Sequence, residues 1–380
     1  MEDKLRLYLK TMIKNGGSDL HVKSGAQVRV RIDGILKIIG QDILSPQMVD
    51  QLAQEITTKD QYQKLQADRN VDFSYVLGEE SRFRVNFFYQ MDGLSAAFRL
   101  IPVKILTLDE LNLPSSVQTF TQIQRGLVLV TGVTGSGKST TLAAILDKIN
   151  KEAKKHIITI EDPIEFVHKD QGCLINQRSI GQDTHSFSEA LRAALREDPD
   201  IILVGEMRDM ETIDIALHAA NTGHLVFSTL HTLDAKETID RIVGMFGAEE
   251  QPRIRMSLAS VLEGVISQRL IPKVSGGRVA ALEILKKTAR IEQLIAQKRD
   301  VEIPDALFDG KDIYGTQTFD QALLDLLRKG EIEMKTALEF ATNPSDMKLK
   351  IEGIGHGALE DQNRSVLKDP DVFDFKPDEA

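Results

Sequence analysis

The chain of 380 residues contains one cysteine and no tryptophan. The single thiol, Cys173, has no second cysteine with which to form a disulfide, and it cannot build a zinc site made of cysteines alone. This scarcity excludes the disulfide-stapled scaffolds of small secreted proteins. It is typical of proteins that work in a reducing compartment.

Long apolar runs are also absent. The longest run covers five or six residues, whereas a membrane-spanning helix needs about 18 or more. Glu2 and Asp3 stand where a secretory signal would carry basic residues. We therefore expect a cytoplasmic protein.

Basic residues do not predominate in the composition. Asp and Glu number 57 against 47 Lys and Arg, which gives a net charge of −10. Proteins that wrap nucleic-acid backbones usually carry a basic bias. The acidic balance therefore argues against nucleic acid as a partner, and against attachment to anionic lipid by charge alone.

Length and composition favour a globular protein with two or three domains. Domains of about 150 residues are usual, and 42% hydrophobic with 27% charged residues is ordinary for soluble folds. We place a small mixed α/β domain at residues 1–100, a proline-bounded linker at 101–114 and a larger domain at 115–355. Residues 356–380 are acidic, and we expect a flexible tail there.

Helical and alternating spacings support the first domain. Apolar residues recur at helical spacing over 5–13, before Gly16-Gly17, so we expect an opening helix. Valines and an isoleucine then alternate with arginines over 28–32, Asp33-Gly34 predicts a hairpin turn, and Ile35-Leu36 begins the expected return strand. Two further strands are expected, at 82–87 and 96–100.

The second domain has the pattern of a parallel sheet covered on both faces. Its strands are short and apolar throughout, and helical segments lie between them. The expected strands are 127–130, 157–160, 201–204 and 225–227. A helix is predicted over 186–197, where Ser186 and Glu189 form a capping-box pattern. After about residue 285 we expect helices.

A nucleotide loop follows the first of these strands. Residues 132–139 fit G-x-x-x-x-G-K-[ST], with a strand before and a helix-forming run after. The backbone amides would cradle phosphates, Lys138 would reach the β- and γ-phosphates, and the Ser139 hydroxyl would hold Mg²⁺. The expected nucleotide-binding residues are Gly132, Thr134, Gly135, Ser136, Gly137, Lys138, Ser139 and Thr140.

Acidic residues and histidines stand at the ends of the other strands. Glu206 follows strand 201–204, where ligands meet parallel sheets, and we expect it to polarise the attacking water. An acidic corner at 161–165 follows the preceding strand, and its carboxylates suit metal or water placement. His224 and His231 flank the last strand, and either a phosphate contact or a structural role fits their spacing.

Together these motifs resemble those of the secretion ATPases, and among them the type IV pilus retraction ATPases. Four blocks occur in the family's order within roughly residues 4–350: the nucleotide loop, the acidic corner, residues 205–209 and the histidine segment 222–232. Residues 17–21 resemble the family's amino-terminal motif. The resemblance implies a PAS-like amino-terminal domain joined to a RecA-like P-loop ATPase domain, assembled as a hexameric ring.

The resemblance also implies roles for single residues. Glu206 would be the catalytic glutamate, and Glu165 would lie in an acidic box near Mg²⁺ and water. His231 would contact the γ-phosphate. The expected metal set is Ser139, Glu165 and Glu206, with the glutamates acting directly or through water.

Four arginines each have two interpretations. Arg84 and Arg99 match amino-domain arginines that close onto bound nucleotide, where they would stabilise transition-state charge. Taken without the resemblance, they are ordinary solvated strand residues. Arg192 and Arg196 lie one helical turn apart beside an apolar stripe, and they either line an interface or are solvated.

Two sequence features bear on which type of pilus or secretion ATPase the chain resembles. Extension and secretion relatives usually carry a four-cysteine zinc module, which Cys173 alone cannot form, so the sequence favours retraction. Principal retraction motors often carry Ala-Ile-Arg-Asn-Leu where this chain has Ala-Arg-Ile-Glu-Gln-Leu at 289–294, and residues 315–323 resemble the accessory type more. Principal and accessory motors therefore both stay open.

We predict a Mg²⁺-dependent ATPase that powers pilus retraction and twitching motility. Its cofactors would be ATP and Mg²⁺. Its partners would be its own copies in a homohexamer, an inner-membrane pilus platform protein, and in some systems a second homologous retraction ATPase. It would work at the inner face of the cytoplasmic membrane. The alternatives are an extension or type II secretion ATPase, a nucleic-acid translocase and a regulatory nucleotide-binding ring.

Overall fold

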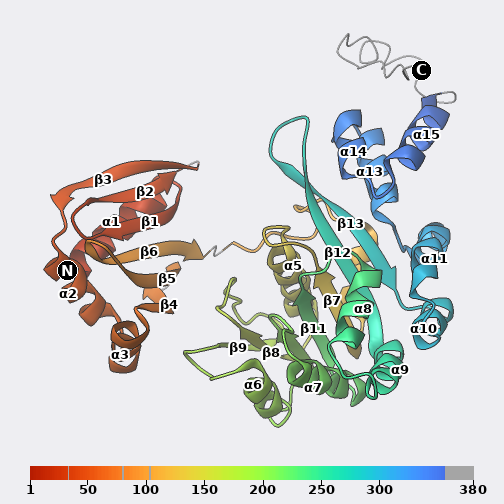
Figure 1. Ribbon diagram of the computed structural model, residues 1–380, viewed down its shortest axis with the longest axis horizontal. Coiled ribbons are helices and arrows are strands. Elements are labelled where there is room, and N and C mark those ends of the chain that lie inside the picture. Colours follow the sequence, from red (N-terminus) through yellow and green to blue (C-terminus); the bar gives the residue numbers. More distant parts are fainter. Residues whose placement is uncertain (33, 79–80, 102–103, 356–380) are drawn as a thin grey trace, which may run out of the picture.

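Two β-sheets, each with its own helices, organise the chain (Figure 1). The computed structural model describes residues 1–32, 34–78, 81–101 and 104–355. The predicted tail at 356–380, Asp33 of the predicted turn and Pro102 of the predicted linker lie outside the described residues. We call residues 1–101 the amino-terminal unit and residues 104–355 the carboxy-terminal unit. The mixed α/β class expected from the sequence is confirmed.

The amino-terminal unit is built on an antiparallel sheet in the order β3-β2-β1-β6-β5-β4. Its strands are β1 (Gly17–Lys23), β2 (Gln27–Ile32), β3 (Ile35–Ile43), β4 (Asn70–Leu77), β5 (Ser81–Gln90) and β6 (Gly93–Ile101). Its helices are α1 (Glu2–Lys14), α2 (Pro46–Ile56) and α3 (Lys59–Asp68). The three helices pack into one core with buried phenylalanines of the sheet, among them Phe87 and Phe98, whose rings meet edge to face at 6.2 Å.

The opening helix and four strands of this unit (β2, β3, β5 and β6) lie where the sequence predicts them, but β1 and β4 were not predicted. β4 carries a period-two pattern, because Val71, Phe73, Tyr75 and Leu77 are buried between more exposed polar residues. In β1, Asp19 and His21 interrupt the apolar pattern. Pairing with β2 and β6 on both sides makes that segment a central strand despite its polar residues.

The carboxy-terminal unit contains a seven-stranded sheet in the order β13-β12-β7-β11-β10-β8-β9. Neighbouring strands are parallel from β9 to β12, and β13 is antiparallel to β12. The strands are β7 (Gly126–Thr131), β8 (His156–Glu161), β9 (Leu174–Ser179), β10 (Ile201–Val204), β11 (Leu225–Leu230), β12 (Leu262–Pro272) and β13 (Arg278–Lys286). The four predicted strands are confirmed as β7, β8, β10 and β11.

Helices cover both faces of this sheet. In β7, Leu127 and Leu129 pack on the side of α6, α7 and α9, whereas Val128 and Val130 pack on the side of α5. The helices are α4 (Ser115–Gln118), α5 (Lys138–Glu152), α6 (Phe187–Ala194), α7 (Met210–Asn221), α8 (Ala235–Gly244), α9 (Gln251–Val261), α10 (Ala289–Ala296), α11 (Ile303–Asp309), α12 (Lys311–Tyr314), α13 (Phe319–Arg328), α14 (Met334–Phe340) and α15 (Pro344–Gly355), with 3-10 turns η1 (Thr119–Gln122) and η2 (Asp300–Glu302). No described helix is long and apolar enough to cross a membrane.

Two expectations about this unit need correction. The helix predicted over 186–197 ends at Ala194, because Asp198 takes a left-handed backbone conformation with φ of 55° and Pro199 follows. Among the described contacts only half of the capping box is present, with the Ser186 hydroxyl accepting from the Glu189 N–H. Strands β9, β12 and β13 were not predicted from the sequence, because polar residues interrupt their apolar runs.

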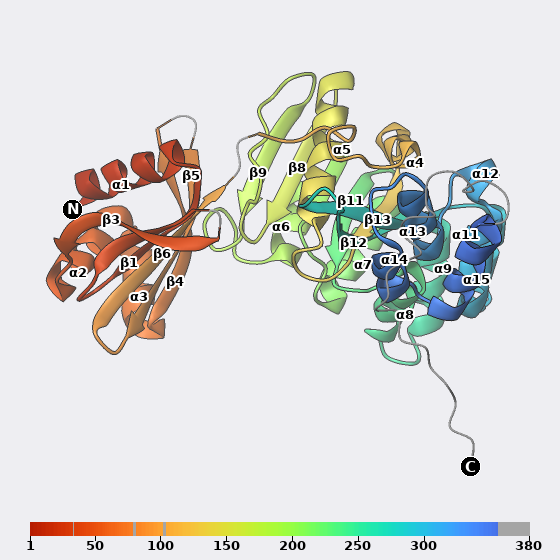
Figure 2. The same cartoon turned by 90° about the horizontal axis from the view of Figure 1, so that it is seen from above.

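Part of the predicted linker is docked rather than extended between the units. Leu108 and Leu113 are buried in the same core as α5 and β7. The segment from about residue 108 onward therefore belongs structurally to the carboxy-terminal unit, and Figure 2 shows the two units in separate halves of the view.

Ile202 tests the importance of the central parallel strands. Its side chain is fully buried in β10 among the helices of one face. We expect Ile202→Ala to lower the free energy of unfolding of this unit by about 2–5 kcal/mol and Ile202→Val by about 0.5–1.5 kcal/mol. Urea unfolding measures both, with Met256→Ala on the exposed face of α9 as the control. An Ile202→Ala variant as stable as that control would contradict this packing.

Candidate active site

The nucleotide loop joins β7 to α5 in the conformation that the motif predicts. Gly132, Gly135 and Gly137 have φ of 142°, 79° and 90°, which side-chain-bearing residues rarely adopt. Gly137 is the N-cap of α5, so the loop ends where free backbone amides and the positive end of the helix dipole meet. This is a ready site for phosphate groups.

Lys138 is held inside the loop by the loop's own carbonyls. Its Nζ donates to the Gly132 oxygen at 2.8 Å and to the Val133 oxygen at 3.2 Å, and the residue is only 8% exposed. Burial lowers the pKa of Lys138, while the charges of Glu206 and Glu165 act in the opposite direction. The ammonium is thus positioned where the predicted phosphates would lie.

Glu206, His231 and Lys138 come together from three separate segments. The His231 Nδ1 lies 3.5 Å from the Lys138 Nζ, and the His231 Nε2 lies 3.4 Å from a Glu206 carboxylate oxygen. Because an ammonium can only donate, Nδ1 is the acceptor, which leaves the imidazole proton on Nε2 facing Glu206. Arg208 pairs with the other Glu206 oxygen at 2.7 Å. The arrangement joins a cation, an imidazole and a carboxylate in one row.

The acidic corner contains one partly buried carboxylate, Glu161, and two exposed ones, Asp162 and Glu165. Glu161 accepts from the Thr159 hydroxyl at 2.7 Å, from the Gln177 amide at 3.2 Å and from the backbone N–H of Glu165 at 3.2 Å. Burial raises the pKa of Glu161. Glu165 itself is exposed. Glu161 therefore positions the segment, and Glu165 and Asp162 are the carboxylates exposed to solvent.

The remaining loop residues are arranged in two groups. Ser139 and Thr140 lie in the half-exposed first turn of α5, and Thr134 and Gly135 form the exposed tip. The Ser136 hydroxyl is buried and has no hydrogen-bond partner among the described residues. An unpartnered buried hydroxyl inside the loop is consistent with a site shaped for a further polar ligand.

Comparison with known proteins places this site in a family. The family model described as "Type II/IV secretion system protein" matches residues 1–302. The chain belongs to this family.

Two relatives and one solved structure illustrate how similar this chain is to known members of the family. The type IV pilus retraction ATPase PilT of Pseudomonas aeruginosa is 49% identical over 333 residues, which cover 88% of this chain and 96% of that protein. The type IV pilus ATPase PilU of the same organism is 37% identical over 345 residues, with 90% of each chain covered. The crystal structure of the pilus retraction motor PilT with bound ADP superposes with a TM-score of 0.84 at 43% identity, covering 90% of this chain and 98% of that one.

In this chain, Arg84 and Arg99 lie away from the cluster of Lys138, His231 and Glu206. They sit opposite each other on β5 and β6. Arg99 donates to Asp19 at 2.7 Å, and Arg84 pairs with Asp72 at 3.8 Å. Both are ion pairs within the amino-terminal sheet, and among the described contacts neither arginine reaches the nucleotide loop. Their predicted role in closing onto nucleotide stays a prediction.

Of the other residues named from the sequence, His224 and Arg192 have structural contacts. The His224 ring contacts the Ala219 carbonyl at 3.0 Å at the end of α7, so it lies at the opposite end of β11 from His231. Arg192 pairs with Glu211 of α7 and so ties α6 to α7, and Arg196 follows the end of α6.

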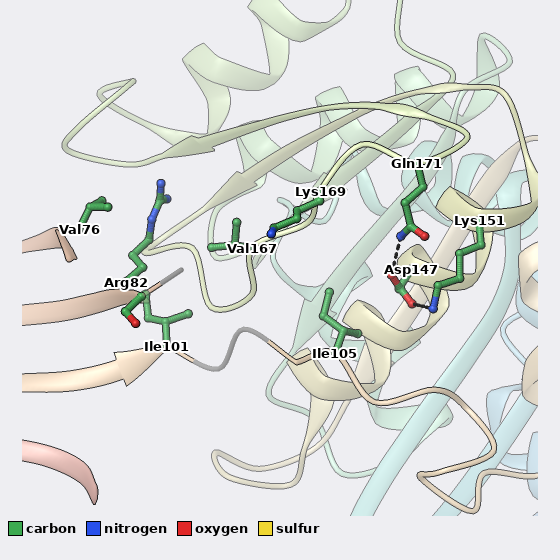
Figure 3. A pocket seen from close by; sticks show the side chains of 10 residues that line it. Val76, Arg82, Ile101, Ile105, Asp147, Lys151, Val167, Lys169 and Gln171 are labelled. Atoms are coloured by element: carbon green, nitrogen blue, oxygen red, sulfur yellow. Dashed lines mark hydrogen bonds and ion pairs between the residues drawn. The ribbon is translucent and has the colours of Figure 1, made fainter. Parts of the chain in front are cut away.

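A cavity of about 270 Å³ lies at the junction of the two units rather than at the nucleotide loop (Figure 3). Arg82 approaches it from β5, and Lys151 and Lys169 approach it from the carboxy-terminal unit. Asp147 bridges Lys151 at 2.6 Å and Gln171 at 3.2 Å. The cavity is therefore lined by residues of both units and does not coincide with the predicted catalytic residues.

Sequence reasoning missed the polar residues that support the site from β12 and β13. Ser267 bonds to Thr131 at 2.9 Å, and Gln268 bonds to the nucleotide loop and α5. Glu283 of β13 accepts from the backbone N–H of Ala235 at 2.8 Å, directly after the segment that carries His231. These residues form no motif in the sequence. Only their polarity within apolar runs could have indicated them.

Glu283 gives a prediction about pH. Burial raises its pKa to about 7 from an ordinary 4.5; Asp234 and Asp320 add to the rise, and Arg269 opposes it. The folded state therefore binds this proton more tightly than the unfolded state. Protonated Glu283 therefore contributes on the order of 3 kcal/mol to the free energy of unfolding below about pH 4.5. This contribution is lost as the pH rises to about 7.

We expect Glu283→Gln to remove this part of the pH dependence. The free energy of unfolding, measured by urea titration at pH 5 and pH 8, should fall more for the parent protein than for the variant. Glu249→Gln at an exposed position is the control. Equal falls in the parent and in Glu283→Gln would contradict a raised pKa for Glu283.

Proposed function

We propose that this chain is an ATP-driven motor for type IV pilus retraction and twitching motility. The observation that carries the proposal is 49% identity over 96% of the length of a type IV pilus retraction ATPase. The cluster of Lys138, His231 and Glu206 supports it, because phosphoryl transfer depends mostly on positioning and charge stabilisation.

In the proposed reaction ATP and water give ADP and phosphate. Lys138 exchanges its loop carbonyls for the β- and γ-phosphates and balances their charge. Glu206 accepts a hydrogen bond from the attacking water and aligns it with the γ-phosphorus. His231, with its Nε2 proton toward Glu206, fixes the carboxylate and lies close to the γ-phosphate.

Mg²⁺ would be held by the Ser139 hydroxyl, with Glu206 and Glu165 acting through water. When bound, it would neutralise charge on the phosphate oxygens. The donor set suits this ion, since hydroxyl, carboxylate and water oxygens are the ligands that Mg²⁺ prefers. Among the described residues no three His, Cys, Asp or Glu side chains gather as a metal cluster, which accords with an ion bound mainly through phosphates and water.

Arg84 and Arg99 are proposed to close onto bound nucleotide when the amino-terminal unit moves. Both side chains are substantially exposed, at 47% and 71%, so they can reach a partner outside their own sheet. A cation that arrives with domain closure would stabilise transition-state charge and so couple chemistry to movement.

The working assembly is proposed to be a homohexamer at the cytoplasmic face of the inner membrane. Its partner would be the pilus platform protein, to which the ring would pass the movement of its domains. A second homologous retraction ATPase is a further proposed partner, since two pilus ATPases of one bacterium both resemble this chain.

An accessory retraction ATPase is the second candidate. It is favoured by residues 315–323, which resemble that type, and by 37% identity to PilU over 90% of both chains. The higher identity to PilT favours the principal motor.

Glu206→Gln tests the proposed chemistry. The glutamine amide keeps the shape of the Glu206 side chain, so we expect ATP binding within about threefold of the parent. It cannot accept a proton or hold the water as a carboxylate does, so we expect turnover to fall at least about 100-fold. Binding of a fluorescent nucleotide and release of phosphate measure the two quantities. Lys138→Ala serves as the contrasting variant, with nucleotide binding itself expected to be lost. Full turnover by Glu206→Gln would refute the assignment.

A strain without the gene tests the biological role. Abundant surface pili without twitching are expected for a principal retraction motor, because assembly continues while disassembly stops. Normal piliation with reduced force would assign the accessory role. Electron microscopy and a twitching assay provide the readout. Absent pili would favour extension, and no pilus phenotype would overturn the proposal.

A further inference from the structure

β12 contacts the nucleotide loop with one residue and the carboxy-terminal helices with the next. Successive side chains of a strand point to opposite faces. Gln268 contacts the loop and α5 on one face, and Arg269 contacts α13 and α14 on the other. Neither residue belongs to a sequence motif described above.

Gln268 uses both ends of its amide on the nucleotide segment. Its Nε2 donates to the Ser136 carbonyl at 2.7 Å, and its Oε1 accepts from the Thr141 hydroxyl at 2.7 Å. The residue is only 3% exposed. A buried amide with both groups paired has one favoured orientation, so Gln268 fixes the loop relative to the first turns of α5.

The nucleotide loop lies in close contact with Gln268 at two of its glycines. A Cβ atom added at Gly137 would lie 2.7 Å from the Gln268 Nε2, and one added at Gly132 would collide with the Gln268 carbonyl oxygen. Both glycines therefore allow the loop backbone to touch β12. A shift of Ser136 must therefore move Gln268 or break the hydrogen bond between them.

Arg269 anchors two helices at the other face of the strand. Its guanidinium lies 3.8 Å from the centre of the Phe319 ring, at the start of α13. Its Nη1 donates to the Phe340 carbonyl at 3.2 Å, at the end of α14. Figure 1 shows α13 and α14 beside the β12–β13 hairpin. One side chain thus holds both helices to the strand that supports the nucleotide loop.

We propose that Gln268 is a positioning residue for ATP hydrolysis and that β12 relays the position of the nucleotide loop to α13 and α14. When phosphates draw Lys138 away from the Gly132 and Val133 carbonyls, the loop and Ser136 shift. Gln268 follows because both its hydrogen bonds lie on that segment, and Arg269 moves with it in the same strand. The inference rests on the proposed ATPase function.

Kinetics test the positioning role. Gln268→Met keeps the length of the side chain and removes both hydrogen bonds, so we expect kcat to fall about tenfold or more, the scale of one lost buried hydrogen bond. Thr141→Val should lower kcat in the same direction, and Thr141→Ser should restore it. The matched control is Gln317→Met, which removes a buried amide bonded to the Leu282 carbonyl away from the loop. Equal kcat for Gln268→Met, Gln317→Met and the parent would overturn the positioning role.

Hydrogen exchange tests the relay in the full chain. Peptides covering 319–340 should exchange differently with saturating ADP and without it in the parent and in Gln317→Met. The difference should disappear in Gln268→Met and in Arg269→Met at ADP concentrations where direct binding assays show both to be saturated. If Gln268 and Arg269 had only structural roles, their substitution would change exchange in 319–340 equally with and without ADP, and the ADP-dependent difference would persist.

The outcomes separate this inference from the proposed function. An unchanged ADP-dependent difference in Gln268→Met and Arg269→Met would overturn the relay. A parent protein that hydrolyses ATP but shows no ADP-dependent difference in 319–340 would overturn it as well. A parent that neither binds nor hydrolyses ATP would refute the proposed function, and the inference with it.

Discussion

The buried charge of Lys138 is the constraint on which the site depends. An ammonium removed from water needs compensating partners, and Lys138 finds two loop carbonyls, with His231 and Glu206 next to it. The loop follows β7, Glu206 follows β10 and His231 follows β11. These three strand ends meet because β11 lies parallel between β7 and β10. The order of the central strands is therefore what brings the proposed catalytic residues together.

The amino-terminal unit contributes charges of a different kind. Arg84 and Arg99 form ion pairs at the surface of their sheet, and exposed pairs of this sort are worth at most about 1 kcal/mol. Exchanging such partners for nucleotide phosphates costs little. A buried pair such as that of Arg255 with Asp300 would resist the exchange. The surface position of the two arginines is thus compatible with their proposed function in a moving domain.

The supports of the site lie on strands that themselves have no catalytic residue. Ser267, Gln268 and Glu283 place polar groups inside a hydrophobic layer, and each is paired. Unpaired, each would destabilise the fold; paired, each fixes one segment of the site. β12 and β13 therefore do more than complete the sheet, since they connect the nucleotide loop and the His231 segment to the carboxy-terminal helices.

The sequence by itself indicated the four central strands, the nucleotide loop with Lys138, and Glu206, because continuous apolar runs, glycine spacing and strand-end acids are local patterns. Spacing left the role of His231 open, and only the family resemblance distinguished it from His224. It did not determine β1, β9, β12 or β13, where polar residues hide the pattern, nor the end of α6 at Ala194. Gln268 lies 132 positions from the Ser136 carbonyl that it contacts. Only the tertiary structure decides such a pairing, because a buried polar side chain acquires its role from the partner that folding brings to it.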